Sequence, residues 1–263
     1  MKRKIVTYTV FLCVIALFCS FTLFKKKVAV MYLIGDSTVA DYSLEANYNT
    51  KRFPLVGWGQ MLQPYLAADS LFQYRQLTNA DSVRVDDRAK GGRSTRSFFE
   101  EGRWEEVYNS LKKGDIVLIQ FGHNDAAKEK HERYVDIPGY KQFLKLYVNQ
   151  TRQKGATPVL LTPVARNYPW QNDRLSNVHG DYPQAVKDVA KELKVKLIDL
   201  NELSMALFSS LGEAYVRKNY FMNLDSGKFV AYPKGQKDDT HFQTAGGIAV
   251  AQLVADALKS AKH

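Results

Sequence analysis

The segment VAVMYLIGDST, residues 28–38, has the pattern of a buried strand followed at once by a tight turn. Its nearly continuous apolar run is typical of a strand covered on both faces, as in a parallel sheet. Gly35 permits a sharp change of direction, so Asp36 and Ser37 come just after the carboxyl end of the strand. Ligands of open α/β sheets bind at that edge. Ser37 is therefore either a nucleophile with a base in reach or a serine that only caps a turn or helix.

Further strands alternate with helical segments along the chain. DIVLIQF, residues 115–121, is the clearest strand, and shorter ones are expected at 83–89, 157–161 and 195–200. Apolar residues spaced i, i+3, i+4 and i+7 predict helices at 58–66, 98–111, 140–148, 182–193 and 250–258. This alternation requires parallel pairing with right-handed crossovers. We therefore expect an α/β fold, a three-layer α/β/α sandwich around a mainly parallel sheet.

One domain is expected over residues 28–263, because no linker, repeat or low-complexity tract occurs there. Residues 209–237 mix Gly, Tyr, Asn and Lys without a period, which predicts a long, partly helical excursion. Long excursions near a catalytic edge often shape a substrate cleft.

The N-terminus predicts export. Residues 5–24 carry no charged side chain and follow a basic start, which indicates a signal peptide or an N-terminal membrane anchor within residues 1–27. We expect a periplasmic or extracellular protein, either released or anchored to the membrane through this segment. Both cysteines, Cys13 and Cys19, lie inside it, so the domain itself has no disulfide and no thiol chemistry.

The net charge does not indicate a nucleic-acid partner. The chain carries a formal charge of +10, but several basic residues flank the N-terminal apolar segment, namely Lys2, Arg3, Lys4, Lys25, Lys26 and Lys27. The remainder has only a small positive excess and no basic stripe. The sequence gives no indication of an oligomeric state.

Three polar turns, around Ser37, Gly92 and Asn124, follow successive predicted strands and should meet at one edge of the sheet. A serine hydrolase needs a hydroxyl, a base, a carboxylate that holds the base, and donors for the oxyanion. His241, just before the closing helix, is the candidate base, and Asp238 is three residues earlier. The candidate oxyanion donors are the backbone N–H groups of Ser37 and Gly92 and the side-chain amide of Asn124.

Other polar residues near these turns have alternative roles. Asp239 competes with Asp238 as the carboxylate. Asp36 and Asp125 are either acids or, as we prefer, braces that accept backbone N–H groups. His123 is expected to support its turn from a buried position, and His179 to lie in a polar loop.

The motifs GDS at 35–37, Gly92, GHND at 122–125 and DxxH at 238–241 together resemble those of the SGNH (GDSL-type) hydrolases. More narrowly, GDSTVADY, KGGRSTRSF, FGHND, TPVAR and DDTHF resemble the rhamnogalacturonan acetylesterase branch, over residues 31–250. The resemblance implies a flavodoxin-like sheet and an SGNH hydrolase domain over 28–263. It also implies Ser37 as nucleophile, Asp238 with His241, oxyanion residues Gly92 and Asn124, and neither a metal nor an organic cofactor.

The function expected from this resemblance is a serine esterase that removes O-acetyl groups from a polysaccharide, foremost acetylated pectin. Arg166, Tyr168 and Trp170, which follow one predicted strand, are candidate sugar contacts, although such aromatic residues as often pack internally. The alternatives are a lipid or short-chain esterase or thioesterase of the same fold, and a silent, tethered glycan-binding domain. A glycoside hydrolase is not expected, because the sequence shows no pair of carboxylates of the kind that such an enzyme uses.

Overall fold

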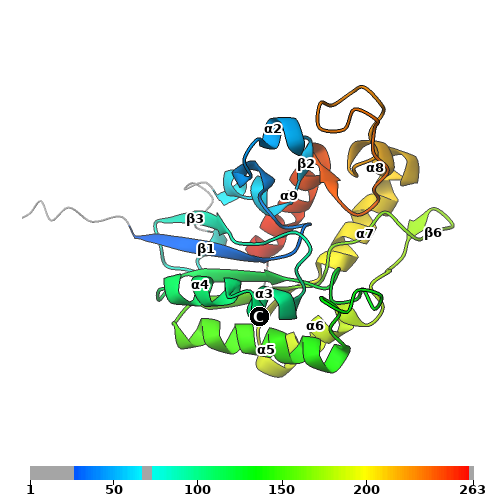
Figure 1. The fold of residues 1–263 in the computed structure, drawn as a ribbon. Helices are drawn as coiled ribbons and strands as arrows, with labels where there is room; N and C mark the ends of the chain where they lie inside the picture. The colour runs from blue at the N-terminus through cyan, green and yellow to red at the C-terminus, as the bar shows by residue number, and fades with distance from the viewer. Residues whose placement is uncertain (1–26, 67–72, 261–263) are drawn as a thin grey trace, which may run out of the picture.

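The computed structural model describes residues 27–66 and 73–260 (Figure 1). The signal peptide or anchor expected at 1–27 lies outside the described residues, apart from Lys27. Within the described ranges, no helix has both the length and the apolar character needed to cross a membrane.

Five parallel strands form the central sheet, in the order β3-β1-β4-β5-β8. They are β1 (Val28–Gly35), β3 (Ser82–Asp87), β4 (Ile116–Gln120), β5 (Thr157–Leu161) and β8 (Lys196–Ile198). Counted along the chain, this is the order 2-1-3-4-5 of flavodoxin-like sheets. The expected fold class is confirmed. Because β1 pairs with β4 from Met31↔Ile116 to Gly35↔Gln120, the turns after these two strands leave the sheet side by side.

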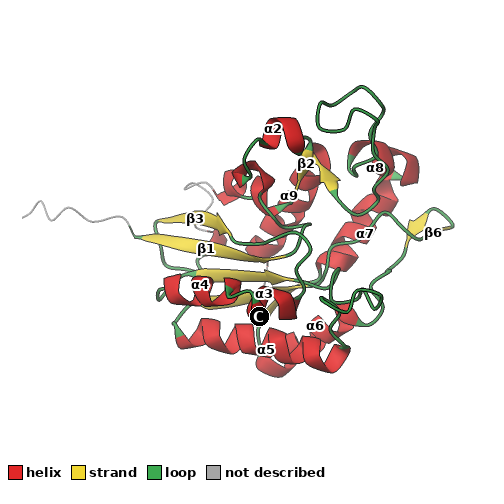
Figure 2. Ribbon diagram, viewed as in Figure 1, coloured by secondary structure: helices red, strands yellow, loops and turns green. Residues whose placement is uncertain are grey.

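Helices cover both faces of this sheet (Figures 1 and 2). One face carries α3 (Thr95–Glu100), α4 (Arg103–Ser110), α5 (Ile137–Gln153) and α6 (Tyr182–Leu193). The other carries α7 (Leu200–Leu211), α8 (Glu213–Asn219) and α9 (Thr244–Ser260). Side chains alternate along β1 accordingly: Tyr32 and Ile34 pack with the first group of helices, and Met31 and Leu33 with the second. The sheet is therefore buried on both sides, as its apolar runs predicted.

Several elements differ from the sequence expectation. The stripe at 58–66 forms two short 3-10 helices, η2 (Gly59–Met61) and η3 (Gln63–Leu66), because Pro64 lacks an N–H and interrupts an α-helix. The apolar side chains of this segment still face the core, since Trp58 and Leu62 are buried. The helix expected at 98–111 is divided into α3 and α4 at Gly102, which has φ of +74°.

Further short elements were not expected. They are η1 (Tyr42–Leu44), α2 (Tyr48–Lys51), β2 (Leu55–Val56), β6 (Trp170–Gln171), β7 (Arg174–Leu175) and β9 (Phe242–Gln243). β2 pairs with β9, and β6 with β7, both antiparallel. The 209–237 excursion is partly helical, as expected: it includes the end of α7 and all of α8, and isolated bridges such as Leu224↔Gln236 fold the rest back on itself.

Candidate active site

Ser37 follows β1 directly, in a tightly constrained turn. A Cβ at Gly35 would lie 2.6 Å from the backbone oxygen of Gln120, so only glycine fits there. The buried Asp36 carboxylate accepts hydrogen bonds from the backbone N–H and the hydroxyl of Thr38, at 2.9 and 2.8 Å. Gln120 Nε2 donates to Thr38 Oγ1 at 2.8 Å and so joins the turn to β4. Asp36 is thus a brace of the turn that presents Ser37.

His241 and Asp238 lie beside Ser37, on the loop that precedes β9. His241 Nε2 is 2.9 Å from Ser37 Oγ, and His241 Nδ1 is 2.7 Å from Asp238 Oδ2. Asp238 Oδ1 accepts from the backbone N–H groups of Thr240 and His241 at 2.8 and 3.0 Å. Burial opposes ionisation, but the interactions with His241 and these N–H groups outweigh it and lower the pKa of Asp238. An ionised carboxylate only accepts, so His241 Nδ1 carries a proton and Nε2 can take one from Ser37.

Asp239 points away from His241 and braces the loop. Its Oδ1 accepts from the side-chain amides of Asn167 and Asn223 at 2.8 and 2.9 Å. These partners come from the segments that follow β5 and α8. Of the two neighbouring aspartates, only Asp238 therefore contacts the histidine.

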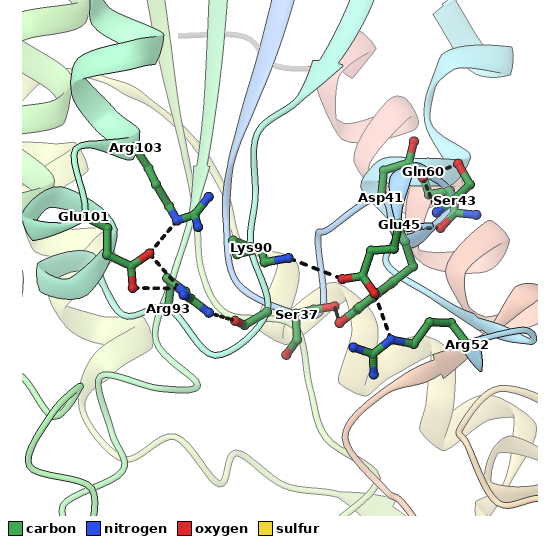
Figure 3. A network of polar contacts seen from close by, with 12 residues as sticks. Ser37, Asp41, Ser43, Glu45, Arg52, Gln60, Lys90, Arg93, Glu101 and Arg103 are labelled. Carbon is green, nitrogen blue, oxygen red and sulfur yellow. Dashed lines mark hydrogen bonds and ion pairs between the residues drawn. The ribbon is translucent and has the colours of Figure 1, made fainter. Parts of the chain in front are cut away.

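The loop between β3 and α3 passes directly beside Ser37. A Cβ built on Gly91 would lie 3.6 Å from the Ser37 Cβ, and Gly92 has φ of +82°, which favours glycine. Arg93 Nη1 donates to the Gly91 carbonyl at 2.9 Å, while Arg93 Nε contacts both carboxylate oxygens of Glu101 at 3.0 Å (Figure 3). Among the described residues, no hydrogen bond takes up the backbone N–H of Ser37 or of Gly92. Both groups can donate to a ligand oxygen.

A second set of contacts holds the 42–52 segment against this loop. Tyr42 donates its hydroxyl to the Ser37 carbonyl at 3.1 Å. Glu45 accepts from Arg52 Nε at 2.8 Å and from Lys90 Nζ at 3.3 Å (Figure 3). These contacts form one side of the cavity wall and leave the Ser37 hydroxyl free of them.

Asn124 lies in the turn after β4, with both ends of its amide bonded. Its Nδ2 donates to the Arg93 carbonyl at 2.9 Å, and its Oδ1 accepts from Arg133 Nη1 at 3.0 Å. The next residue, Asp125, accepts from the backbone N–H of Thr95 at 2.9 Å and so braces the turn, as expected. Burial raises the pKa of Asp125 to about 7, although its hydrogen bonds with Thr95 act against that rise.

His123 is buried and supports its turn, as expected, and His179 lies in a loop, as expected, although its side chain is buried. His179 is only 3% exposed, and its Nε2 lies 3.1 Å from His123 Nδ1. Arg166 Nε contacts the same His123 nitrogen at 3.2 Å, and Arg166 Nη1 donates to the Tyr168 hydroxyl at 2.6 Å. Burial lowers the pKa of both histidines, that of His179 to about 3, so both rings are neutral at physiological pH.

These groups line one open cavity of about 830 Å³. Ser37, Gly92, Asn124, Asp238, His241 and Arg166 all contribute to its wall. Trp170 lies elsewhere: its indole Nε1 donates to the backbone and side-chain oxygens of Asn167, both at 3.1 Å, and its ring packs against the core. In residues 27–66 and 73–260, no group of three or more His, Cys, Asp or Glu side chains is placed to hold a metal ion.

Sequence reasoning did not find Arg133, Arg93 or the burial of His179. Each lies in an irregular segment without a period, where residue spacing does not indicate which side chains make contact. The only sequence indication for Arg93 was its place directly after the Gly91-Gly92 pair.

Named proteins resemble this chain over most of its length. It is 39% identical over 230 residues to the probable rhamnogalacturonan acetylesterase YesY of Bacillus subtilis (strain 168), an alignment that covers 87% of this chain and 92% of the relative. It is 37% identical over 234 residues to the rhamnogalacturonan acetylesterase RhgT of the same strain. That alignment covers 89% of this chain and 91% of the relative.

Solved structures share the fold. The protein YxiM of Bacillus subtilis has a TM-score of 0.71 and 29% identity, covering 89% of this chain and 57% of that one. An acetylxylan esterase of Geobacillus stearothermophilus has a TM-score of 0.52 at 20% identity, covering 89% and 95%, which is a likeness of fold alone. The model of the GDSL-like Lipase/Acylhydrolase family matches residues 33–246, a range that includes all the cavity-lining residues named above. With this match and these relatives, the chain belongs to the GDSL-like lipase/acylhydrolase family.

Proposed function

We propose that this chain is a serine esterase that removes O-acetyl groups from a polysaccharide, with acetylated rhamnogalacturonan as the first candidate. One observation carries the proposal: Ser37 Oγ lies 2.9 Å from His241 Nε2, and His241 Nδ1 lies 2.7 Å from Asp238. Acyl transfer by serine requires this combination of a hydroxyl, a base and a carboxylate that holds the base's tautomer.

The acylation step follows from these contacts. His241 Nε2 takes the hydroxyl proton as Ser37 Oγ attacks the acetyl carbonyl carbon. The carbonyl oxygen becomes an oxyanion that accepts hydrogen bonds from the N–H groups of Ser37 and Gly92 and from Asn124 Nδ2. When the tetrahedral intermediate collapses, the bond to the sugar oxygen breaks and His241 gives its proton to that oxygen. The products are a free sugar hydroxyl and an acetyl ester on Ser37.

Deacylation repeats the same proton transfers with water. His241 Nε2 takes a proton from a water molecule, which attacks the acetyl carbonyl on Ser37. The same donors stabilise the second oxyanion, and His241 returns the proton to Ser37 Oγ as acetate leaves. Asp238 stays ionised throughout and stabilises the imidazolium that forms in both steps.

The lining of the cavity supports a polar alcohol portion over a long acyl chain. Charged and hydrogen-bonding side chains dominate it, and Leu55, Val178 and Met222 are its larger aliphatic members. An acetyl group needs apolar contact only for one methyl, whereas a long acyl chain must bury each of its methylenes. The relatives named probable rhamnogalacturonan acetylesterase, at 39% identity, and rhamnogalacturonan acetylesterase, at 37% identity, support the choice of glycan.

Sugar contacts by Arg166 and Tyr168 are part of this proposal. Arg166 lines the cavity, and its Nη1 donates at 2.6 Å to the hydroxyl of Tyr168, an exposed residue beside the cavity wall, so a sugar that reaches this side meets a guanidinium and a phenol. Contact with Trp170 would require a glycan that extends beyond the cavity.

Export also belongs to the proposal, and it rests on the apolar residues 5–24 after a basic start. Fractionating cells that express the full chain tests it. The protein should appear outside the cytoplasm, either released or with the membrane fraction, and a purely cytoplasmic protein would contradict export.

Acetate release decides among the candidate functions. The purified protein is incubated with acetylated rhamnogalacturonan, acetylated xylan, and acetyl, butyryl and octanoyl p-nitrophenyl esters, with Ser37→Ala as the control. We expect acetate from the pectic glycan and a steep loss of kcat/KM beyond butyryl. A preference for the octanoyl ester would indicate a lipid esterase. Glycan binding without acetate release would indicate a silent binding domain.

A further inference from the structure

The two contacts of the Asn124 amide determine its orientation without ambiguity. The Arg93 carbonyl can only accept a hydrogen bond, so the atom 2.9 Å from it must be the amide nitrogen. The Arg133 guanidinium can only donate, so the atom 3.0 Å from Nη1 must be the amide oxygen. One amide hydrogen is used by the Arg93 carbonyl, and among the described residues no acceptor takes the second, although Asn124 lines the cavity.

Arg133 reaches this position from the same loop, which continues beyond Asn124. The backbone N–H of Arg133 donates to the Lys130 carbonyl at 3.0 Å, and Val135 N–H donates to the Asp125 carbonyl at 3.1 Å, so the loop folds back on itself. A Cβ on Gly92 would lie 3.5 Å from Arg133 Nη1. The guanidinium therefore lies next to two of the groups proposed as oxyanion donors.

The charge of Arg133 is only weakly compensated. Its ion pair with Glu132 spans 3.6 Å, and the Glu132 side chain is 72% exposed, so solvent screens the pair. The Arg133 side chain is 21% exposed, and its buried Nε has no hydrogen-bond partner among the described residues. A cation in this setting polarises the amide to which it donates, because a charge-assisted hydrogen bond at Oδ1 draws electron density from the amide nitrogen.

We propose that Arg133 is a positioning residue for the reaction: by donating to Asn124 Oδ1, it holds the amide with Nδ2 toward the oxyanion and strengthens Nδ2–H as a donor. Arg133 itself does not touch the reacting atoms. Without it, only the Arg93 carbonyl would oppose a rotation of the amide by half a turn, which would direct an oxygen lone pair at the developing negative charge. The inference rests on the proposed esterase activity and assigns one further residue to it.

Kinetics on p-nitrophenyl acetate, a neutral substrate, tests this role. Arg133→Met removes the donor and the charge while keeping much of the side-chain length. It should lower kcat by roughly tenfold, a fraction of the loss for removing an oxyanion donor outright, with KM changed less than about twofold. Arg133→Lys keeps a charged donor and should recover most of kcat. Lys128→Met removes a cation of the same loop that does not line the cavity, and it should match the wild type.

A double-mutant cycle separates positioning from any independent effect. In an Asn124→Ala background the amide is absent, so Arg133→Met should cause no further loss of kcat. An equal loss in both backgrounds would overturn the proposal, as would an effect on KM alone or an equal loss in Lys128→Met. Thermal melting of each variant verifies the fold, and Arg133→Ala, which also removes the donor and the charge, serves the same comparison if Arg133→Met does not fold.

The failure of this inference differs from the failure of the proposed function. A wild type that hydrolyses the ester through Ser37, with unchanged kcat in Arg133→Met, overturns the role of Arg133 alone. A wild type without hydrolysis, or a Ser37→Ala variant that is fully active, overturns both.

Discussion

Replacing Asp238 by asparagine tests whether the Asp238 carboxylate holds His241 in the tautomer that can act as a base. The new Oδ1 can still accept the backbone N–H groups of Thr240 and His241, which lie at 2.8 and 3.0 Å from the present oxygen. Its Nδ2 would then face His241 Nδ1, where the carboxylate oxygen now lies at 2.7 Å. A donor at that place favours the tautomer with the proton on Nε2, so Ser37 loses the acceptor for its proton.

The expected loss of kcat for Asp238→Asn is about 10⁴-fold, the size associated with a wrong histidine tautomer in a serine hydrolase. This corresponds to about 5.5 kcal/mol of activation free energy. Asp239→Asn is the matched control: it keeps the acceptor for Asn167 and Asn223 and loses only the ion pair with Arg217, at 3.5 Å and half exposed. That pair contributes at most about 1 kcal/mol to the free energy of unfolding.

Steady-state hydrolysis of p-nitrophenyl acetate measures both variants, and urea unfolding measures their stability. Asp239→Asn should keep nearly all of the wild-type kcat. The reasoning is refuted if Asp239→Asn loses more activity than Asp238→Asn, or if Asp238→Asn retains a large share of the wild-type kcat.

Three further outcomes are expected. Ser37→Ala should abolish ester hydrolysis and leave the melting temperature nearly unchanged; residual turnover through a different nucleophile would appear as burst kinetics in the variant. Asn124→Ala should lower kcat by roughly 10² to 10³ with KM little changed, whereas a change in KM alone would make Asn124 a substrate contact. Burial lowers the pKa of His123 and His179, so these two residues bind protons below about pH 6.5 in the unfolded chain but not in the folded protein, and their contribution to the free energy of unfolding falls as the pH drops, whereas the raised pKa of Asp125 acts in the opposite direction. The urea midpoint of the wild type should therefore fall relative to that of His179→Asn between pH 7 and 5, and a constant difference would contradict the neutral pair.

The sheet and the turns at its edge could be predicted from the sequence because their determinants are local. Buried strands such as 28–35 and 116–120 are continuous apolar runs, and Gly35 and Gly92 mark turns that other residues resist. Chain order with parallel pairing then brings the turns after β1, β3 and β4 to one edge. Ser37 and Asn124 could be nominated for that reason.

The remaining features depend on contacts that no short window of sequence contains. The pair of two-residue strands β2 and β9 is too short for an alternation to be visible. His179 is buried because the ring of His123, from another loop, lies against it. The stripe at 58–66 has a helical spacing, but Pro64 limits it to 3-10 turns, and spacing alone does not distinguish the two.

Ser37 and Asn124 are held by the central sheet, whereas His241 is held by a separate, smaller part of the fold. The part that holds His241 is therefore expected to be the less stable one. Ser37 and Asn124 follow strands in the middle of the buried sheet. His241 depends instead on the short β2–β9 ladder and on the hydrogen bond from Met222 N–H to its carbonyl, at 2.9 Å. Close packing supports this loop, since a Cβ on Gly246 would lie 2.3 Å from the Tyr220 carbonyl oxygen.

A local opening of residues 220–243 would therefore separate the base from the serine while the sheet stayed intact. Such an opening breaks the β2–β9 ladder and the turn hydrogen bonds of this segment and exposes Phe221 and Phe242, but it leaves the five-stranded sheet paired, so its free energy is smaller than that of global unfolding. Activity should accordingly be lost at lower denaturant concentrations than the secondary structure of the sheet. The placement of His241, more than that of Ser37, then determines the denaturant concentration up to which Ser37, His241 and Asp238 stay in contact.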